Sequence, residues 1–241
     1  RVKKLFKAKK IGHTGTLDPF AEGLMILCLG KATRLARFFL HGEKTYEALL
    51  FLGIETDTQD STGERISTGD VQGLTGEDVV QAFKKFEGTM EQVPPVFSAL
   101  KHKGKPLYQL AREGRPVRKP PRTVHFYRLE VLAVDLPEVR FRVTCSAGAY
   151  IRTLAADIGK DLGCGGHLKK LRRTSSSGID IENAVSLETL EKIAETDGKG
   201  EVSFDKLLLP MARALDHLPE YEAGKKLVKR IANGVALEER D

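Results

Sequence analysis

The sequence predicts an α+β fold with a mixed, largely antiparallel central sheet flanked by helices. Apolar residues alternate in several extended segments and recur at helical spacing in others, so strands and helices both occur. Two extended segments, 123–136 and 139–145, are separated by a short turn and predict neighbouring strands. Strands and helices do not follow the regular strand–helix–strand order of a parallel sheet, which favours the α+β class.

The first forty residues predict a basic start, a loop, a strand and a helix. Residues 1–10 contain six Lys or Arg side chains and open abruptly, so we expect a preceding segment to be missing. Residues 11–22 are rich in Gly, Thr and Pro and predict a loop. The apolar run 24–29 predicts a buried strand, and helical spacing predicts an amphipathic helix over 31–40.

The rest of the chain adds one long strand and several helices. Alternation over 45–54 predicts a strand that ends in a polar loop, DTQDSTG. Thr75 with Asp78 resembles a capping box at the start of a helix, and 107–113 predicts a short helix closed by glycine. A dense basic run follows at 167–178. Further helices are predicted over 150–162, 186–195 and 225–233.

Charge and cysteine content restrict the function classes. The formal charge of +6 and the pI near 9.1 favour a polyanionic partner such as a nucleic acid. The three cysteines form no CxxC pair, which is typical of a reducing compartment and predicts neither a disulfide scaffold nor a metal site. No window reaches the roughly 18 consecutive apolar residues of a membrane span. We therefore expect a soluble, cytoplasmic protein.

The segment GHTGTLDP at 12–19 concentrates turn-forming and reactive residue types. Pro19 biases the backbone of Asp18 toward an extended conformation. A carboxylate held on such a loop can act as a nucleophile, a general base or an electrostatic stabiliser. The alternative is an Asx-type turn in which the carboxylate bonds only its own backbone, and an isolated Asp in such a loop would favour that interpretation.

Several longer blocks of sequence follow the GHTGTLDP loop in a fixed order. They are GLMILCLGKATR, KTYEALLFLG, QVPPVFSALKHKGKPLYQLAREG, SAGAYIRTLAADIG and GCGGHLKKLRRTSSSGI. In order and approximate spacing, these blocks resemble the bacterial tRNA pseudouridine-55 synthases, the TruB family. The resemblance covers residues 1 to about 180 and implies the pseudouridine synthase fold.

The resemblance implies a role for each residue that matches a family motif. Asp18 matches the catalytic aspartate, and Tyr46 matches the tyrosine that stacks on the flipped uracil. Arg152 matches the arginine that pairs with the aspartate, since a guanidinium fork keeps a partly buried carboxylate ionised and oriented. Tyr150 matches a second aromatic of the pocket, and Leu171 is a candidate for its apolar floor. Ordinary core packing is the alternative for the tyrosines.

A histidine and several basic residues are the candidate RNA contacts. His13 matches a histidine beside the disrupted base stack, where a flat side chain can fill the space of the extruded nucleotide. Phosphate contacts would supply much of the affinity. The candidates are Arg34, Arg37, Lys169, Lys170, Arg172, Arg173 and the stretch RPVRKPPR at 115–122. A solvated charged face is the alternative for each of them.

The implied activity is the isomerisation of uridine to pseudouridine at position 55 in the T-loop of tRNA. It proceeds by base flipping and replaces a C–N glycosidic bond with a C–C bond, so we expect no metal and no organic cofactor. We expect the tRNA T-arm stem-loop as the partner, with no required protein partner and no membrane. Residues 1–224 are expected to form the catalytic domain without the family's N-terminal segment, and 225–241 to begin a truncated C-terminal RNA-binding domain or tail.

Two alternatives stay open at this point. The guide-RNA-dependent pseudouridine synthases have similar GTLDP and AGTYIRTL-like blocks, although KHKGKPLYQLAREG and KIGHTGTLDPFAEG look more like the stand-alone bacterial branch. A non-catalytic protein that binds or remodels tRNA could retain the same fold. The presence of Asp18, Tyr46 and Arg152 together favours an enzyme.

Overall fold

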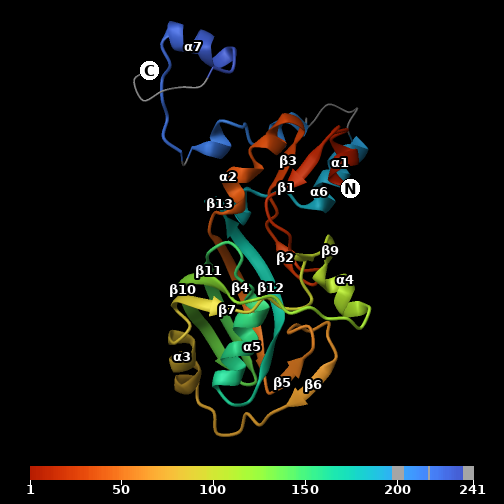
Figure 1. Cartoon of the computed structure of the whole chain (residues 1–241), viewed down its shortest axis with the longest axis vertical. Coiled ribbons are helices and arrows are strands. Elements are labelled where there is room, and N and C mark those ends of the chain that lie inside the picture. The colour runs from red at the N-terminus through yellow and green to blue at the C-terminus, as the bar shows by residue number, and fades with distance from the viewer. Residues whose placement is uncertain (197–203, 217, 236–241) are drawn as a thin grey trace. The chain divides into compact units, whose positions relative to one another are not determined.

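The structure is a computed structural model that describes residues 1–196, 204–216 and 218–235. The chain divides into two compact units, Arg1–Glu195 and Thr196–Asp241, and Figure 1 labels most of their helices and strands. Among the described residues, no helix is both long and apolar enough to cross a bilayer.

A seven-stranded sheet forms the centre of the first unit. Six of its strands lie in the order β13-β12-β4-β11-β10-β7, and β2 also pairs with β12. Every pairing is antiparallel except that of β2 with β12, so the predicted mixed, largely antiparallel sheet is confirmed. The strands are β2 (Glu22–Gly23), β4 (Lys44–Leu52), β7 (Gly88–Gln92), β10 (Arg122–Asp135), β11 (Glu138–Cys145), β12 (Gly166–Ser176) and β13 (Ile179–Asp180).

Alternation along β4 decides which face of the sheet is buried. Its even-numbered residues, from Tyr46 to Leu52, are buried on one face, whereas odd-numbered residues such as Glu47 point to the other. The helices α3 (Gly76–Lys84) and α5 (Ile151–Asp161) pack their apolar residues into the same core cluster. Figure 1 shows α5 lying across the sheet. We call this side of the sheet the core face and the other side the open face.

The helices predicted beyond residue 70 are confirmed. Thr75 and Asp78 form a complete capping box at the start of α3, with each side chain bonded to the other residue's backbone N–H. The remaining predicted helices are α4 (Leu107–Arg112), α5, α6 (Leu187–Thr196) and α7 (Lys225–Ala232).

The basic run at 167–178 differs most from its sequence-based interpretation. It forms β12, an internal strand of the sheet between β13 and β4. A β-bulge between Leu168 and Lys170 allows Leu168 and Leu171, three positions apart, both to be buried on the core face. The period of two that identifies a strand in a sequence is therefore lost here.

The first forty residues contain shorter elements than the sequence predicts. After helix α1 (Val2–Leu5), strand β1 (Ile11–His13) pairs with β3 (Leu27–Leu29), which is the second half of the predicted strand at 24–29. The predicted helix over 31–40 is divided into a 3₁₀ helix, η1 (Gly30–Arg34), and α2 (Ala36–Leu40). The division lies at Leu35, whose N–H bonds the carbonyl of Ala32, three residues back.

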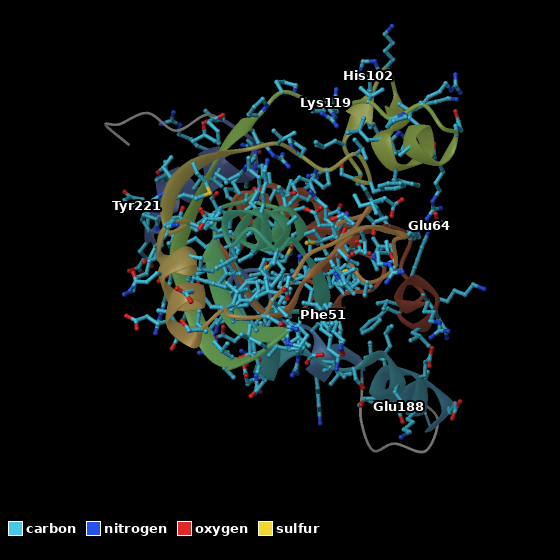
Figure 2. All side chains as sticks on the ribbon, turned by 90° about the horizontal axis from the view of Figure 1, so that it is seen from below. Phe51, Glu64, His102, Lys119, Glu188 and Tyr221 are labelled. Atoms are coloured by element: carbon cyan, nitrogen blue, oxygen red, sulfur yellow. The ribbon has the colours of Figure 1, made fainter. Side chains whose placement is uncertain are left out.

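Smaller elements surround the sheet. One hairpin, β5 (Ile54–Thr56) with β6 (Arg65–Thr68), encloses the polar loop at 57–63. A second hairpin precedes α4 and consists of β8 (Lys101–His102) and β9 (Lys105–Pro106). Figure 2 shows the labelled side chains of His102 and Lys119 at the periphery of the molecule. A 3₁₀ helix, η2 (Ile181–Asn183), follows β13.

The second unit contains two 3₁₀ helices, η3 (Phe204–Leu207) and η4 (Arg213–Leu215), and α7. The C-terminal segment predicted at 225–241 includes α7, whereas its last residues, 236–241, lie outside the described residues. The predicted domain boundary after residue 224 stays a prediction.

Candidate active site

The loop at 12–19 is held by backbone bonds and by its apolar side chains. The N–H of Thr14 bonds the carbonyl of Ile26, and the N–H of Ala21 bonds the carbonyl of Asp18, which closes a turn with Pro19 inside it. Leu17 packs against the core cluster. The turn therefore uses the main-chain carbonyl of Asp18, and its carboxylate, with the side chain 29% exposed, points to a partner elsewhere.

That partner is Arg152, in the first turn of α5. Its Nε donates to Oδ2 of Asp18 at 2.8 Å, and its Nη2 donates to Oδ1 at 3.0 Å. The same guanidinium donates to the carbonyl of Thr58 at 2.8 Å and to that of Phe97 at 2.9 Å. Because the Arg152 side chain is only 3% exposed, these four bonds hold its guanidinium in one position. The guanidinium in turn holds the carboxylate of Asp18 in one orientation.

A second carboxylate, that of Asp60, lies on the other side of the arginine. Its Oδ2 is 3.6 Å from Nη1 of Arg152, and its side chain is 6% exposed. The Oδ1 atom accepts bonds from the hydroxyl of Thr58 and from the N–H and hydroxyl of Thr62. The bonds from Thr58 and Thr62 therefore hold Asp60 in place through Oδ1, while Oδ2 balances the buried positive charge of Arg152. Sequence reasoning did not single out this residue.

Tyr46 lies on the core face of β4 and is 8% exposed. Burial is the main cause that raises the pKa of Tyr46 to about 12; the Cys145 thiol and the Asp18 carboxylate act in the same direction, and the nearby Arg173 guanidinium opposes them. The phenol is therefore neutral at pH 7. Tyr46 pairs with Arg173 across β4 and β12, and the guanidinium of Arg173 bonds the carbonyl of Gly15, three residues before Asp18, so the two predicted residues lie in one neighbourhood.

Tyr150 is the residue that starts α5. Its N–H donates to Oε1 of Gln92 at 2.7 Å, and its carbonyl accepts from Nε2 of Gln92 at 3.0 Å. Its ring faces the Arg122 guanidinium, with 4.8 Å from Cζ to the ring centroid. Tyr150 is thus held at both backbone and ring, two residues before Arg152.

Leu171 and His13 lie in contrasting environments. Leu171 is 5% exposed and belongs to the core cluster together with Tyr46. His13 is exposed on β1, where it pairs with Leu27. The roles predicted for them, a pocket floor and an RNA contact, stay predictions.

The predicted phosphate contacts do not form one patch. Arg34 and Arg37 are exposed on η1 and α2. Lys170 pairs across β12 and β4 with Leu49, and Arg172 pairs with Glu47, so both point to the open face, opposite to Asp18. Lys169 is bonded to Glu138 and lies 5.1 Å from the Phe51 ring centroid.

Arg173 corrects the prediction made for it. It pairs with Tyr46 on the core face and is 2% exposed. Its guanidinium donates to two main-chain carbonyls, those of Leu24 and Gly15. The predicted phosphate contact is therefore not available to this side chain, because an RNA backbone cannot reach it. Arg172 is exposed and Arg173 is buried because neighbouring residues of a strand point to opposite faces of the sheet. In the sequence the two arginines look alike.

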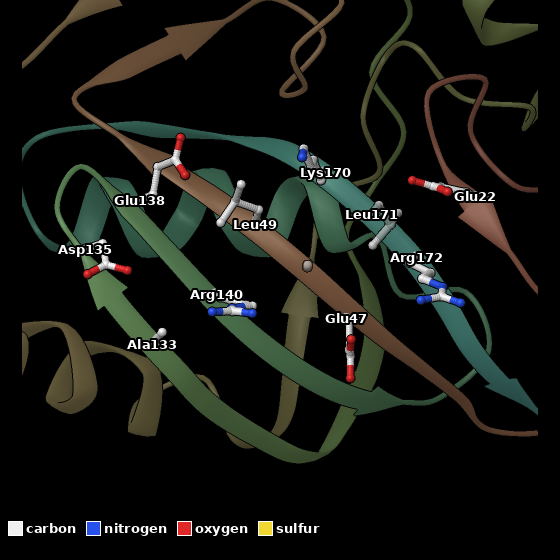
Figure 3. A pocket seen from close by; sticks show the side chains of 11 residues that line it. Glu22, Glu47, Leu49, Ala133, Asp135, Glu138, Arg140, Lys170, Leu171 and Arg172 are labelled. Atoms are coloured by element: carbon white, nitrogen blue, oxygen red, sulfur yellow. The ribbon is translucent and has the colours of Figure 1, made fainter. Parts of the chain in front are cut away.

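A shallow groove of about 370 Å³ crosses the open face (Figure 3). Its charged lining residues are Glu22, Glu47, Asp135, Glu138, Arg140, Lys170 and Arg172. Carboxylates outnumber cations there, and Asp18, Tyr46 and Arg152 are not among its lining residues. This groove is therefore distinct from the site around Asp18.

Two family models match the chain consecutively. Residues 3–151 match the family described as TruB family pseudouridylate synthase (N terminal domain), and residues 152–216 match the tRNA pseudouridylate synthase B C-terminal domain. Together they span most of the described residues.

Curated relatives named tRNA pseudouridine synthase B are similar over nearly the whole chain. The protein from Ralstonia pickettii is 46% identical over 241 residues, which are 98% of this chain and 74% of the relative. The protein from Bacillus pumilus is 41% identical over 243 residues, with 98% of this chain and 77% of the relative covered.

Solved structures of Cbf5 are similar in fold. The chain aligns with Cbf5 from a Cbf5-Nop10-Gar1 complex at a TM-score of 0.70 and 33% identity, covering 90% of this chain and 56% of that one. For the archaeal box H/ACA sRNP Nop10-Cbf5 complex the TM-score is 0.72 at 28% identity, covering 98% of this chain and 62% of that one. The chain thus spans less than two thirds of these solved chains. On the family models and the curated relatives, the chain belongs to the TruB family of tRNA pseudouridine synthases.

Proposed function

We propose that this protein converts uridine 55 in the T-loop of tRNA to pseudouridine, with Asp18 as its catalytic residue. The observation that carries the proposal is the fork between Arg152 and Asp18, which holds a partly exposed carboxylate in one orientation. A carboxylate that is both fixed and accessible can act as a nucleophile or base on a bound nucleotide. We further propose that it works in the cytoplasm and needs no protein partner.

The reaction exchanges one glycosidic bond for another. The bond from ribose C1′ to uracil N1 breaks and a bond from C1′ to C5 forms. The C5 proton leaves to solvent and N1 takes up a proton, so the product is an isomer of uridine. Asp18 is proposed to act on the nucleotide during cleavage. Tyr46 is proposed to stack on the extruded uracil, and its neutral phenol, with a pKa of about 12, suits that role better than the role of an ionised base at pH 7.

Extruding the base from the T-loop costs a few kcal/mol, and stacking on an aromatic ring returns about 1–3 kcal/mol. Phosphate contacts supply the remaining affinity. The exposed Arg34 and Arg37 are the first candidates for them, because neither is engaged by a carboxylate in an ion pair of the described residues. Arg118, exposed between α4 and β10, is a further candidate.

The direct test uses tRNA that carries tritium at C5 of its uridines. We expect the wild-type chain to release tritium and to modify position 55, as read by sequencing of the product. Asp18→Asn keeps the size of the side chain but removes its charge, so we expect release to stop while the Kd for tRNA changes by less than about threefold. Unchanged release by this variant would remove Asp18 from the mechanism.

The guide-RNA-dependent alternative is tested with a bare T-arm stem-loop. The curated relatives named tRNA pseudouridine synthase B are 41–46% identical to this chain, whereas the Cbf5 chains are 28–33% identical, which favours the stand-alone branch. We expect turnover of the stem-loop without guide RNA or added protein. Binding without any tritium release would instead support a non-catalytic role in tRNA binding or remodelling.

A further inference from the structure

Arg173 is a buried cation without a buried anion bonded to it. It is 2% exposed, and within the described parts of the chain no carboxylate oxygen lies within 4.0 Å of its guanidinium nitrogens. Burying a guanidinium is costly unless its N–H groups are satisfied. The N–H groups of Arg173 must therefore be satisfied by other acceptors, and these are main-chain carbonyls.

Those contacts bracket the loop that carries Asp18. Nε of Arg173 donates to the carbonyl of Leu24 at 2.7 Å, and Nη2 donates to the carbonyl of Gly15 at 3.1 Å. The two carbonyls lie at the two ends of the segment 15–24, with Asp18 between them. One planar side chain thus joins both ends of the segment, which a single ammonium group cannot reproduce with the same geometry.

The main chain of Arg173 holds the same segment. Its carbonyl accepts a bond from the N–H of Leu24 at 2.8 Å, and Gly23 pairs with it across β2 and β12. Gly23 has a φ of +103°, and a Cβ atom there would lie 2.3 Å from the carbonyl oxygen of Arg173. The chain can approach β12 this closely only because residue 23 has no side chain.

Arg173 also reaches the second predicted residue of the site. It pairs with Tyr46 in the register of β12 and β4, and its guanidinium is close enough to the Tyr46 hydroxyl to act on its charge state. The loop that carries Asp18 and the strand that carries Tyr46 therefore share one point of attachment.

We propose that Arg173 is a positioning residue that sets the place of Asp18 relative to Tyr46 by fastening both ends of the segment 15–24 to β12. Arg152 orients the carboxylate, and Arg173 places the backbone from which it projects. The kinetic consequence rests on the proposed function, whereas the attachment of the loop does not. A displacement of about 1 Å in such a site can cost about a hundredfold in rate.

The test compares Arg173→Lys and Arg173→Met with Arg140→Lys in the full chain. Arg140 is an exposed arginine on β11, at the open face. We expect both Arg173 variants to lower the single-turnover rate of tritium release by about tenfold or more, with the Kd for tRNA within about threefold of wild type. Hydrogen exchange of the backbone amides in 15–24 is expected to accelerate, whereas exchange in β10 and β11 stays unchanged.

Arg140→Lys is expected to match wild type in every measurement. An Arg173→Lys chain with wild-type single-turnover rate and wild-type exchange in 15–24 would overturn the proposal. So would a uniform acceleration of exchange through the whole sheet, because that outcome describes a general packing role.

A second pair of variants covers the case in which the Arg173 chains do not fold. Gly23→Ala keeps the buried guanidinium but forces the segment away from β12. Gly88→Ala, at a φ of +104° beside the +103° of Gly23, introduces the same backbone strain where nothing lies within 4 Å of the added atom. We expect faster exchange in 15–24 and a slower single turnover for Gly23→Ala alone. Equal behaviour of the two variants would contradict the proposal. If the wild-type chain releases no tritium, the proposed function fails, while the exchange measurements still decide the role of Arg173.

Discussion

At the scale of single residues, the site depends on how one buried guanidinium is surrounded. Arg152 lies between two carboxylates, with Asp18 bonded at 2.8 and 3.0 Å and Asp60 at 3.6 Å. Asp18 is 29% exposed, whereas Asp60 is 6% exposed and bonded to Thr58 and Thr62. The two carboxylates thus differ only in their surroundings: that of Asp18 is accessible to a ligand, whereas that of Asp60 is buried.

This arrangement predicts that Asp60 acts through Arg152. Asp60→Asn removes the negative charge beside Nη1, so the guanidinium should shift toward Asp18 and alter its orientation. We expect the single-turnover rate of tritium release to fall about 10- to 100-fold, with the Kd for tRNA within about threefold of wild type.

Asp57→Asn is the matched control, because Asp57 lies in the same loop and bonds the N–H of Glu64 without contacting Arg152. Equal rates for the two variants would show that the charge of Asp60 has no part in the reaction.

At the scale of elements, the start of α5 decides where Arg152 lies. The helix begins after Tyr150, whose N–H and carbonyl are both bonded by the side chain of Gln92 on β7. Gln92 is 2% exposed, so these two bonds have no competition from water. A buried amide side chain therefore joins the edge strand of the sheet to the helix that carries the arginine.

Gln92→Leu is expected to affect both stability and rate. It leaves the N–H of Tyr150 without its bond to Gln92, whereas the carbonyl of Tyr150 keeps its bond from the N–H of Leu154. The free energy of unfolding should therefore fall by about 1–3 kcal/mol. The single-turnover rate should fall as well, since the first turn of α5 loses its attachment.

Thr75→Ala serves as the control in chemical denaturation and tritium release. It removes the cap of α3, at a cost of about 1 kcal/mol, and α3 contributes no residue to the site. We expect it to lower stability without changing the rate in folded protein. A Gln92→Leu chain with a normal rate would show that α5 is positioned by its core packing alone.

At the scale of the whole molecule, the basic residues behind the formal charge of +6 divide into those bonded to carboxylates and those exposed without such a bond. On the open face, Lys169 is bonded to Glu138 and Arg142 to Glu47, so part of the basic charge is neutralised within the protein. Exposed surface charges without such partners are more effective in binding a polyanion, because they release counterions from it.

Salt dependence of tRNA binding tests this division. We expect log K to fall linearly with log salt, and Arg34→Gln to weaken binding and to reduce the slope by about one. Arg140→Gln, at the open face, is expected to leave the slope unchanged. Filter binding between about 50 and 200 mM salt measures both, and a smaller slope for Arg140→Gln would show that RNA contacts the open face.

Local sequence patterns were enough to predict the α+β class of the fold and most of its elements. The alternation in β4, the capping box of Thr75 and Asp78 and the helical spacing of α5 are local patterns, and each formed as its period requires. The motifs also identified Asp18 and Arg152, which are 134 residues apart, as residues of one site, because family resemblance carries information about distant pairs.

The contacts of the side chains around Asp18 and Arg152 became known only from the folded structure. The bulge in β12 removed the period that would have identified the strand, so buried Arg173 could not be told from exposed Arg172 in the sequence. Asp60 and Gln92 are polar residues in segments without a distinctive pattern, and their partners lie on other elements. A buried polar side chain is defined by the groups that satisfy it, and those groups come together only when distant segments pack.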